Sequence, residues 1–583
     1  MNFSILAGIF EKMENTTKRL ELTDHLVELF NNTPPDLISK IIYLIQGKLR
    51  PDYEGVEIGI AEKLAVRAVS KSSGIQVAEI EDVFRDDGDL GAAASKILSR
   101  RKQTTFVAQV ITVERVYDTL YKIAKLQGSN SQERKIKYIS SLLNDANPTE
   151  ARFMIKLLLG TLRLGIAENT VMDGLALAFT GNKKNRQIIE DAYNVSSDLG
   201  EIANTVCTGG VKALCEFNIS VFRPIRPMLA DRVKSEAEAV EKMGDGFAAE
   251  YKLDGERVQI HTKDGQVQIF SRSLENVTKF YPDIKEDICS NLKCSNAILE
   301  AEAVAINPAT GNFLPFQELM HRRKKHGIKK AVAEYPISVN FFDALYVNGH
   351  SYLDSGYVQR RAILEKTVKE GNFAKCIMAI TVNFENDIVE FMEDSINSGA
   401  EGLMLKMPNS PYMAGARGNH WLKLKREYRN ELGDSLDLVV IGAYFGKGRR
   451  TGRYGTLLLA TYDDNDDSFS SICKVGTGFT DEHLDQLYQI LSGSAASKKD
   501  TRVKSDMVAD VWFPPELVIE VVASEITLSP IHKTAFGVFK KDTGLALRFP
   551  KFTGRIRSDK LPEAASTWEE VVSLYKAQNK SKS

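Results

Sequence analysis

The stretch E-Y-K-L-D-G-E-R, from Glu250 to Arg257, is the most informative part of this 583-residue chain. Its pattern K-x-D-G-x-R places Lys252 close to an aspartate and an arginine. Neighbouring cations lower the pKa of a lysine and expose the neutral amine, which is a nucleophile. The stretch therefore predicts covalent catalysis through Lys252.

The residues that follow predict a β-hairpin. Apolar residues alternate with polar ones on both sides of the turn sequence Lys263-Asp264-Gly265, at Val258, Ile260, Val267 and Ile269. On this pattern Lys252 sits where a loop enters a strand. The less favoured alternative is a surface hairpin whose charged residues form a solvated cluster.

Composition limits the classes of protein to consider. A chain of 583 residues is too long for one core and should divide into roughly three or four domains. Its hydrophobic content of 43% and charged content of 26% are ordinary for a globular protein. The net charge of −1 does not exclude a nucleic-acid partner, because affinity for phosphates depends on where the cations lie.

The cysteines and the apolar segments exclude several further classes. The six cysteines form no C-x-x-C pair and no Cys/His ligand spacing, so neither a zinc module nor a disulfide framework is indicated. The segment Met1–Phe10 is apolar but lacks a basic leader, and Glu11 and Lys12 follow it. No apolar run approaches the roughly 20 residues of a spanning helix. We expect a soluble intracellular protein with no membrane partner.

Residues 1–221 are predicted to form an all-helical domain, because apolar residues recur there at helical spacing. In the sequence R-L-G-I, from Arg163 to Ile166, Gly165 lies between two helical runs, and a basic cluster follows at residues 182–186. Helix N-terminal amides beside such a glycine can bind a phosphate. A helix-hairpin turn with a solvated basic face explains the same residues equally well.

Residues 222–434 mix strands and helices and contain most of the candidate site residues. Glu300 and Glu302 are two apart and project from one face of an apolar strand, where paired carboxylates suit a divalent cation such as Mg²⁺. Phe341 and Phe342 point to opposite faces of another strand, so that one ring can enter the core and the other can stack on a base. Two core phenylalanines are the alternative.

Two further strands carry charged residues. In E-G-L-M-L-K, regular alternation places Glu401 and Lys406 on opposite faces, which predicts that one of them lies outside the site, and Glu401 is the preferred site residue. In W-L-K-L-K, Lys423 and Lys425 share one face. Two amines on one face repel each other unless an anion lies between them, and a phosphate meets that requirement.

Residues 435–583 are predicted to be rich in short strands. The loop G-K-G-R-R-T-G-R-Y-G, residues 446–455, joins two of them. Its glycines allow the backbone to approach a nucleic acid closely, and its cations are candidate DNA-phosphate contacts: Lys447, Arg449, Arg450 and Arg453. A solvated hairpin tip is the alternative.

The motifs around Lys252, Glu302, Phe342, Glu401 and Lys423 stand in the order and approximate spacing of the covalent nucleotidyltransferases. Within that superfamily the chain resembles the ATP-dependent DNA ligases of the archaeal and eukaryotic replicative type over nearly its whole length. The resemblance implies an all-α DNA-binding domain (1–221), an α+β adenylation domain (222–434) and a β-barrel OB-fold domain (435–583). Ala301 and Lys551 depart from the residues frequent in that family, without removing a reactive group.

The resemblance also implies a reaction in three steps. Lys252 attacks the α-phosphate of ATP and forms lysyl-AMP, AMP passes to the 5′-phosphate of a nick, and the 3′-hydroxyl then displaces AMP. The family pattern assigns the nucleotide pocket to Glu250, Arg257, Arg272, Glu302, Phe342, Arg417 and Lys423, with Phe342 stacked on adenine. It assigns Mg²⁺, or Mn²⁺ in its place, to Glu302 and Glu401. It assigns the departing pyrophosphate to Lys425, Arg548, Arg555 and Arg557.

The partner implied by the resemblance is nicked duplex DNA, bound by a monomer in the cytoplasm of a prokaryotic cell and associated with its nucleoid. Whether a sliding clamp recruits the protein stays open. An RNA ligase or a capping guanylyltransferase would use the same lysine, but the large helical region disfavours both. The missing zinc-cysteine cluster disfavours an NAD-dependent ligase. The intact lysine and acidic motifs disfavour a nucleic-acid clamp without activity.

Overall fold

The computed structural model describes residues 1–100, 109–128, 130–307, 311–322, 328–369, 371, 374–425, 435–446 and 450–580. The chain forms two compact units, Met1–Lys425 and Arg426–Ser583. The predicted boundary at 221/222 falls within the first unit, in the connection between its helical and its strand-containing parts. The predicted boundary at 434/435 adjoins residues 426–434, which lie outside the described residues.

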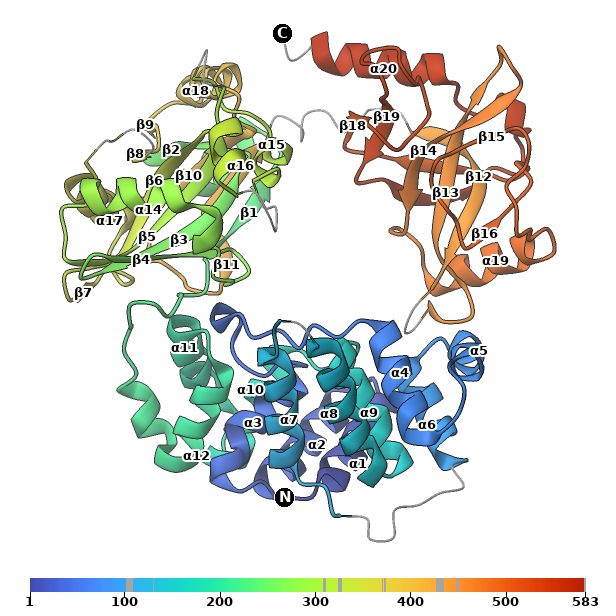
Figure 1. Ribbon diagram of the computed structural model, residues 1–583. Coiled ribbons are helices and arrows are strands. Elements are labelled where there is room, and N and C mark those ends of the chain that lie inside the picture. Colours follow the sequence, from blue (N-terminus) through green and yellow to red (C-terminus); the bar gives the residue numbers. More distant parts are fainter. Residues whose placement is uncertain are drawn as a thin grey trace. The chain divides into compact units, whose positions relative to one another are not determined.

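The first part of unit 1 is helical, as predicted (Figure 1, blue to teal). Its α-helices share one continuous apolar core. They are α1 (Phe3–Glu14), α2 (Arg19–Asn31), α3 (Ile38–Ile45), α4 (Glu62–Ser73), α5 (Val77–Asp87), α6 (Leu90–Ser99), α7 (Val113–Lys125), α8 (Ser131–Asp145), α9 (Pro148–Leu159), α10 (Glu168–Thr180), α11 (Arg186–Ser196) and α12 (Leu199–Cys215).

The sequence R-L-G-I lies in the connection between α9 and α10. Gly160, with φ of 64°, ends α9 in the left-handed conformation that glycine tolerates. Leu162 and Leu164 are buried, whereas Arg163 and Gly165 are exposed. The two leucines therefore anchor this connection while Arg163 projects into solvent.

Two sheets form the second part of unit 1. The first has the order β1-β11-β10-β2-β9, and the second has the order β4-β3-β5-β6-β7, with β8 beside β6. Their strands are β1 (Leu229–Val233), β2 (Phe247–Lys252), β3 (Glu256–Lys263), β4 (Gln266–Ser271), β5 (Asn296–Ala305), β6 (Ile337–Val347), β7 (His350–Ser351), β8 (Ala374–Cys376), β9 (Ala379–Val382), β10 (Gly402–Lys406) and β11 (Arg417–Lys425).

The predicted hairpin is confirmed. Strands β3 and β4 pair antiparallel from Val258 opposite Ser271 to Lys263 opposite Gln266. The two residues of the turn, Asp264 and Gly265, have φ values of 50° and 76°, as a tight hairpin turn of mirror-image type requires.

The two sheets are joined by a shared core. One face of the second sheet packs against the first sheet, and Phe342 of β6 belongs to this cluster together with Leu403 and Trp421. The other face carries Phe341 and packs against helices on the outside. The prediction that the two phenylalanines point to opposite faces is therefore confirmed. The helices of this part are α13 (Glu236–Met243), α14 (Pro282–Asn291), α15 (Phe316–Met320), α16 (Ile328–Glu334), α17 (Tyr357–Thr367) and α18 (Glu385–Asn397).

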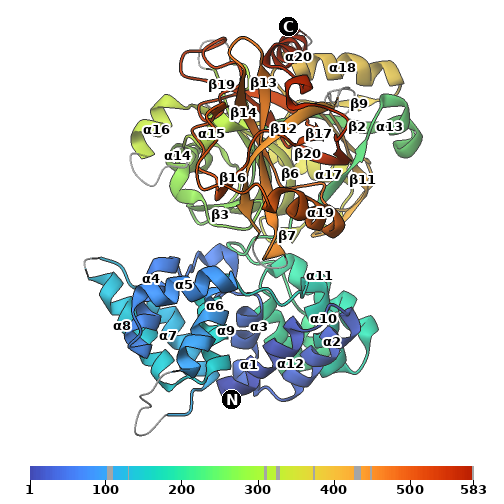
Figure 2. The same ribbon diagram turned by 90° about the vertical axis from the view of Figure 1, so that its right-hand side faces the viewer.

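Unit 2 is rich in strands, as predicted (Figure 2). One sheet has the order β15-β14-β13-β12-β17-β20 with β16 beside β12, and β18 pairs with β19. Helix α20 packs against β18. The elements are β12 (Leu436–Phe445), β13 (Tyr454–Asp463), β14 (Ser468–Val475), α19 (Asp481–Ser492), β15 (Val503–Lys504), β16 (Val511–Trp512), β17 (Val518–Val522), β18 (Glu525–Ser529), β19 (Gly544–Arg548), β20 (Lys551–Ile556) and α20 (Trp568–Lys580).

Candidate active site

Lys252 is the last residue of β2. After a short turn, β3 begins at Glu256. The prediction that a loop leads into a strand at Lys252 is therefore wrong, since the lysine ends one strand before the turn into the next. Gly255 makes this turn possible. A Cβ atom at position 255 would lie 2.4 Å from the carbonyl oxygen of Ala303 on β5, so only glycine allows the chain to pass there.

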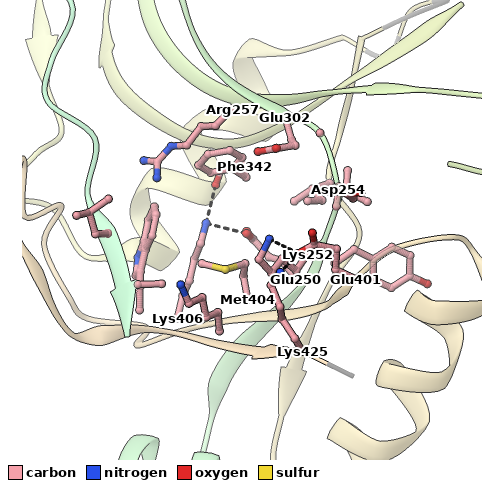
Figure 3. A pocket seen from close by; sticks show the side chains of 18 of the residues that line it. Glu250, Lys252, Asp254, Arg257, Glu302, Phe342, Glu401, Met404, Lys406 and Lys425 are labelled. Carbon is pink, nitrogen blue, oxygen red and sulfur yellow. Dashed lines mark hydrogen bonds and ion pairs between the residues drawn. The ribbon is translucent and has the colours of Figure 1, made fainter. Parts of the chain in front are cut away.

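Lys252 faces a cavity of about 330 Å³ (Figure 3). The lining includes every residue of unit 1 that was predicted to bind the nucleotide, the metal or pyrophosphate: Glu250, Lys252, Arg257, Arg272, Glu302, Phe342, Glu401, Arg417, Lys423 and Lys425. Residues from both sheets thus converge on one cavity, although more than 170 positions of sequence separate the first from the last.

Glu401 bridges two amines at this site. Its Oε2 lies 2.7 Å from Nζ of Lys252 and 2.7 Å from Nζ of Lys425 (Figure 3). Burial by itself would raise the pKa of the Glu401 carboxyl, but the two ammonium groups outweigh burial and hold this pKa at about 2. The carboxylate is therefore ionised at neutral pH and fixes the position of the Lys252 amine.

Positive charge accumulates around Lys423. Burial lowers the pKa of the Lys423 amine, and so do the neighbouring cations Arg417, Lys252, Lys425 and Arg272. These groups repel one another without an anion between them. The prediction that Lys423 and Lys425 share a face is confirmed, because both line the cavity while Leu422 and Leu424 lie in the core. This wall of the cavity is suited to a polyphosphate.

Glu302 and Glu401 are the residues that could hold a divalent cation. Burial raises the pKa of the Glu302 carboxyl to about 7, although Lys252 and Arg257 act in the opposite direction. Glu300, by contrast, is buried and paired with Arg257 at 2.6 Å, which occupies one of its oxygens. Mg²⁺ commonly binds one or two carboxylates together with substrate phosphates. The pair Glu302 and Glu401 fits that pattern.

No larger metal cluster accompanies this pair. Among the described residues, no group of three or more His, Cys, Asp and Glu side chains is arranged to hold a metal ion. In the described part of the chain, no disulfide is formed by Cys207, Cys215, Cys294, Cys376 or Cys473. None of the described helices is long and apolar enough to cross a membrane.

Lys406 also lines the cavity, contrary to one prediction from the sequence. Its Nζ is 2.7 Å from Oε2 of Glu250 and donates to the carbonyl oxygen of Phe342 at 3.1 Å (Figure 3). Glu401 and Lys406 therefore both line the cavity, and the prediction that one lies outside is wrong. The reason is Gly402, whose φ of 150° interrupts the strand alternation before Glu401 is reached.

Glu250 is held from several sides. In addition to Lys406, the hydroxyl of Tyr357 donates to its Oε1 at 2.6 Å, and Arg361 lies 3.5 Å from the same oxygen. Burial lowers the pKa of the Lys406 amine, while Glu250 favours its charged form. The ammonium group lies over the rings of Phe342 and Trp421, at 4.9 and 4.4 Å from their centroids.

Arg257 lines the cavity but directs its donors into the protein. Its Nη1 donates to the carbonyl oxygen of Met228 at 2.7 Å, and its Nη2 donates to Glu300 and to the hydroxyl of Tyr412. The guanidinium group also lies 5.4 Å from the ring centroid of Phe342. Arg257 thus forms part of the cavity wall and is hydrogen-bonded to the chain segment before β1.

Several further residues line this cavity without having been assigned a role in the site from the sequence: Tyr251, Asp254, Ile377, Met404 and Trp421. A signal for Trp421 was present, because alternation places it on the same strand face as Lys423 and Lys425. Asp254 belongs to the K-x-D-G-x-R pattern and accepts a hydrogen bond from the backbone of Phe316 at 3.0 Å. Nothing in the local sequence indicates that partner.

The predicted cations of unit 2 have partners within that unit. Arg548 pairs with Glu525 at 2.6 Å, Arg555 lies 3.6 Å from Glu520, and Arg557 pairs with Asp437 at 2.7 Å. In the predicted DNA-binding loop, Arg450 donates to the carbonyl oxygens of Gly455 and Gly476, and Arg453 pairs with Asp485. Lys447 and Arg449 lie outside the described residues.

Comparison with known families agrees with this site. Residues 2–176 match the family described as DNA ligase N terminus, residues 227–425 match the ATP dependent DNA ligase domain, and residues 450–560 match the ATP dependent DNA ligase C terminal region. All residues that line the cavity around Lys252 lie within the second of these matches.

Curated relatives match the full length. A DNA ligase of Nitrosopumilus maritimus is 66% identical over 580 residues, covering 100% of this chain and 99% of the relative. DNA ligase 2 of Thermofilum pendens is 47% identical, covering 99% and 98%. The solved structure named Pmar-Lig_PreS3 has a TM-score of 0.56 at 17% identity, covers 94% of this chain and 99% of that chain, and shows similarity of fold. The chain belongs to the family of ATP-dependent DNA ligases.

Proposed function

We propose that Lys252 is the residue that becomes covalently linked to AMP when this DNA ligase reacts with ATP. The observation that carries the proposal is the convergence of Lys252, Lys423, Lys425, Arg272 and Arg417 on one cavity of about 330 Å³. A cavity with this excess of cations suits the triphosphate, and the ring of Phe342 beside it suits the adenine base.

In the first step, Nζ of Lys252 attacks the α-phosphorus of ATP. The neutral amine forms a nitrogen–phosphorus bond, the bond to the bridging oxygen breaks, pyrophosphate leaves, and the nitrogen releases a proton to solvent. Glu401 orients the attacking amine from 2.7 Å. Lys423 and Lys425 stabilise the negative charge that develops on the phosphates, because fixed charges in a partly buried site act more strongly than in water.

In the second step, AMP passes from Lys252 to the 5′-phosphate at a nick in duplex DNA. In the third step, the 3′-hydroxyl attacks the adenylated phosphate, AMP leaves, and the strand is sealed. We assign the grip on the duplex to the helical region 1–221, with Arg163 and the backbone at Gly165 as phosphate contacts. The exposure of Arg163 on an anchored connection supports this assignment.

A divalent cation, Mg²⁺ or Mn²⁺, would be held by Glu302 and Glu401. Bound there, it would act as a Lewis acid on the phosphate oxygens. Burial and the nearby Glu401 raise the pKa of the Glu302 carboxyl to about 7, and a cation bound beside both carboxyls would favour their ionised forms.

We further propose that residues 222–434 are the adenylation domain and that residues 435–583 form an OB-fold. The antiparallel pairing of β12 with β13 and of β13 with β14 supports the second assignment. In this domain Arg548, Arg555 and Arg557 would contact the departing pyrophosphate. Arg450 and Arg453, with Lys447 and Arg449, would contact DNA. The protein would act as a monomer.

The central assignment is tested with ATP labelled at the α-phosphate, in the presence of Mg²⁺. The wild type should acquire an acid-labile, alkali-stable covalent label. Lys252→Ala should acquire none, because the nucleophile is missing. Lys423→Ala serves as the control, since it removes a neighbouring amine and should slow labelling by roughly 10²–10³-fold without abolishing it. A label that persists in Lys252→Ala would refute the assignment.

A further inference from the structure

A short connector, residues 222–228, joins the helical region to the strand-containing part of unit 1. Three side chains of β3 hold its backbone: Arg257, Gln259 and His261. They stand two residues apart and therefore share one face of the strand. The backbone groups they bind belong to Met228, Ile225 and Phe222, which are three residues apart. The strand and the connector are thus fastened at three successive points.

The bond at His261 requires one tautomer of the ring. The backbone N–H of Phe222 donates to Nδ1 of His261 at 2.9 Å, so this nitrogen carries no hydrogen. The other ring nitrogen, Nε2, lies 2.8 Å from Oε1 of Gln259 and must be the donor. The ring is fully buried and packs edge-on against Phe270. Burial lowers the pKa of His261 to about 3, which keeps the ring neutral at any physiological pH.

The bonds at Gln259 continue the same pattern. Its Oε1 accepts from the backbone N–H of Ile225 at 2.7 Å, and its Nε2 donates to the carbonyl oxygen of Ile225 at 3.0 Å. Gln259 therefore satisfies both backbone groups of one buried connector residue. Arg257 makes the third attachment, at Met228, and it also lines the nucleotide cavity.

The helical region also contacts the connector. Arg223 pairs with Glu201 of α12 at 2.5 Å, and Ser197 donates to the carbonyl oxygen of Pro224 at 2.5 Å. Arg226 pairs with Glu168 at 2.7 Å. Its guanidinium group also lies 4.6 Å from the ring centroid of Tyr193. A displacement of the connector along β3 would therefore move the helical region with it.

We propose that Gln259 and His261 are positioning residues that fix the connector, and with it the helical region, relative to the nucleotide cavity. Neither residue lines the cavity around Lys252. They are accordingly required for the two steps that use DNA and not for the reaction of Lys252 with ATP. The inference rests on the proposed role of the helical region in holding the duplex.

The test compares three variants of the full-length protein. His261→Leu keeps an apolar side chain beside Phe270 but removes the acceptor for Phe222. His261→Asn restores an acceptor, because the amide oxygen of asparagine occupies about the position of Nδ1. Ile260→Val is the matched control, since it loosens packing on the opposite face of the same strand without touching the connector. For each variant, the rate of self-adenylation and the KM and kcat for sealing nicked duplex DNA are measured.

We expect His261→Leu to adenylate itself within about twofold of the wild-type rate while its KM for nicked DNA rises at least tenfold. His261→Asn should recover most of that loss, and Ile260→Val should change neither quantity. Hydrogen exchange at the amides of Phe222 and Ile225 should accelerate in His261→Leu only. Equal losses of adenylation and sealing, or an unchanged KM for DNA, would overturn the inference. A wild type that failed to adenylate would instead refute the proposed role of Lys252.

Discussion

At the scale of single residues, two carboxyls of the site have different pKa values because their surroundings differ. Glu401 lies between two ammonium groups and has a pKa of about 2, whereas burial raises the pKa of Glu302 to about 7. The two groups are chemically alike, but only Glu302 changes its charge in the physiological range. The ionisation of Glu302 therefore determines how the binding of a cation between the two carboxyls depends on pH.

This difference predicts a pH-dependent requirement for Mg²⁺. The Glu302 carboxyl is mostly protonated below its pKa of about 7 and becomes a ligand above it. The Mg²⁺ concentration for half-maximal self-adenylation should therefore be about tenfold higher at pH 6 than at pH 8. Titrations with Mg²⁺ at both pH values measure it.

Glu302→Gln is the matched variant for that experiment. Its amide cannot ionise, so its Mg²⁺ requirement should be high and nearly independent of pH between 6 and 8. Glu401, with its pKa of about 2, should make no contribution to the slope in this range. A pH dependence that survives unchanged in Glu302→Gln would assign the titration to another group.

At the scale of the element, β10 shows how one backbone position shapes the site. Gly402 has a φ of 150° and pairs with Lys252 on one side and Lys425 on the other. A Cβ atom there would lie 2.2 Å from the carbonyl oxygen of Leu424. On the other side of β10, the backbone N–H of Glu401 donates to the carbonyl oxygen of Lys252 on β2 at 2.8 Å.

We therefore expect Gly402→Ala to be strongly disruptive. The new methyl group must push β10 and β11 apart, which should cost about 2–4 kcal/mol of stability and displace Glu401 from the two amines. Self-adenylation should fall by at least tenfold. Thermal unfolding and labelling with α-labelled ATP measure the two effects.

Gly418 of β11 provides the control for that substitution. A Cβ atom at position 418 would meet no atom within 4 Å. Gly418→Ala should therefore change stability by less than about 1 kcal/mol and leave labelling intact. Equal effects of the two substitutions would show that the close approach at Gly402 is not the cause of the losses of stability and self-adenylation.

At the scale of the whole molecule, the charge of the chain says little about its binding of DNA. The net charge is −1, yet cations gather locally, as they do around the cavity at Lys252. Arg163 is different from those cations, because it is exposed on the connection between two helices of the helical region. A cation in such a place is available to a phosphate of the duplex.

Binding of nicked duplex DNA should accordingly weaken steeply with salt. If six or more phosphates are neutralised, the affinity should fall by about 10³-fold between 50 and 200 mM salt. Arg163→Ala should weaken binding to all sequences alike and reduce the salt slope by about one. Arg163→Lys retains the charge and should retain the slope. Fluorescence anisotropy over a salt series measures both, and an affinity independent of salt would contradict the prediction.

Local sequence patterns were enough to determine much of this protein. Alternation with a period of two predicted the β3–β4 hairpin and the opposite directions of Phe341 and Phe342, because strand geometry depends on neighbouring residues alone. The same rule predicted the shared face of Lys423 and Lys425. The order of the motifs then identified Lys252 and the other cavity residues of unit 1.

The tertiary structure decided what depends on distant partners. Regular strand alternation predicts Glu401 and Lys406 on opposite faces, but with the unusual φ of Gly402 both lie at the cavity. Gln259 and His261 likewise have the pattern of ordinary strand residues. Their hydrogen bonds to a connector more than 30 positions earlier in the chain are evident only in the folded structure. Their roles arise from the meeting of segments far apart in sequence, and no local periodicity encodes such a meeting.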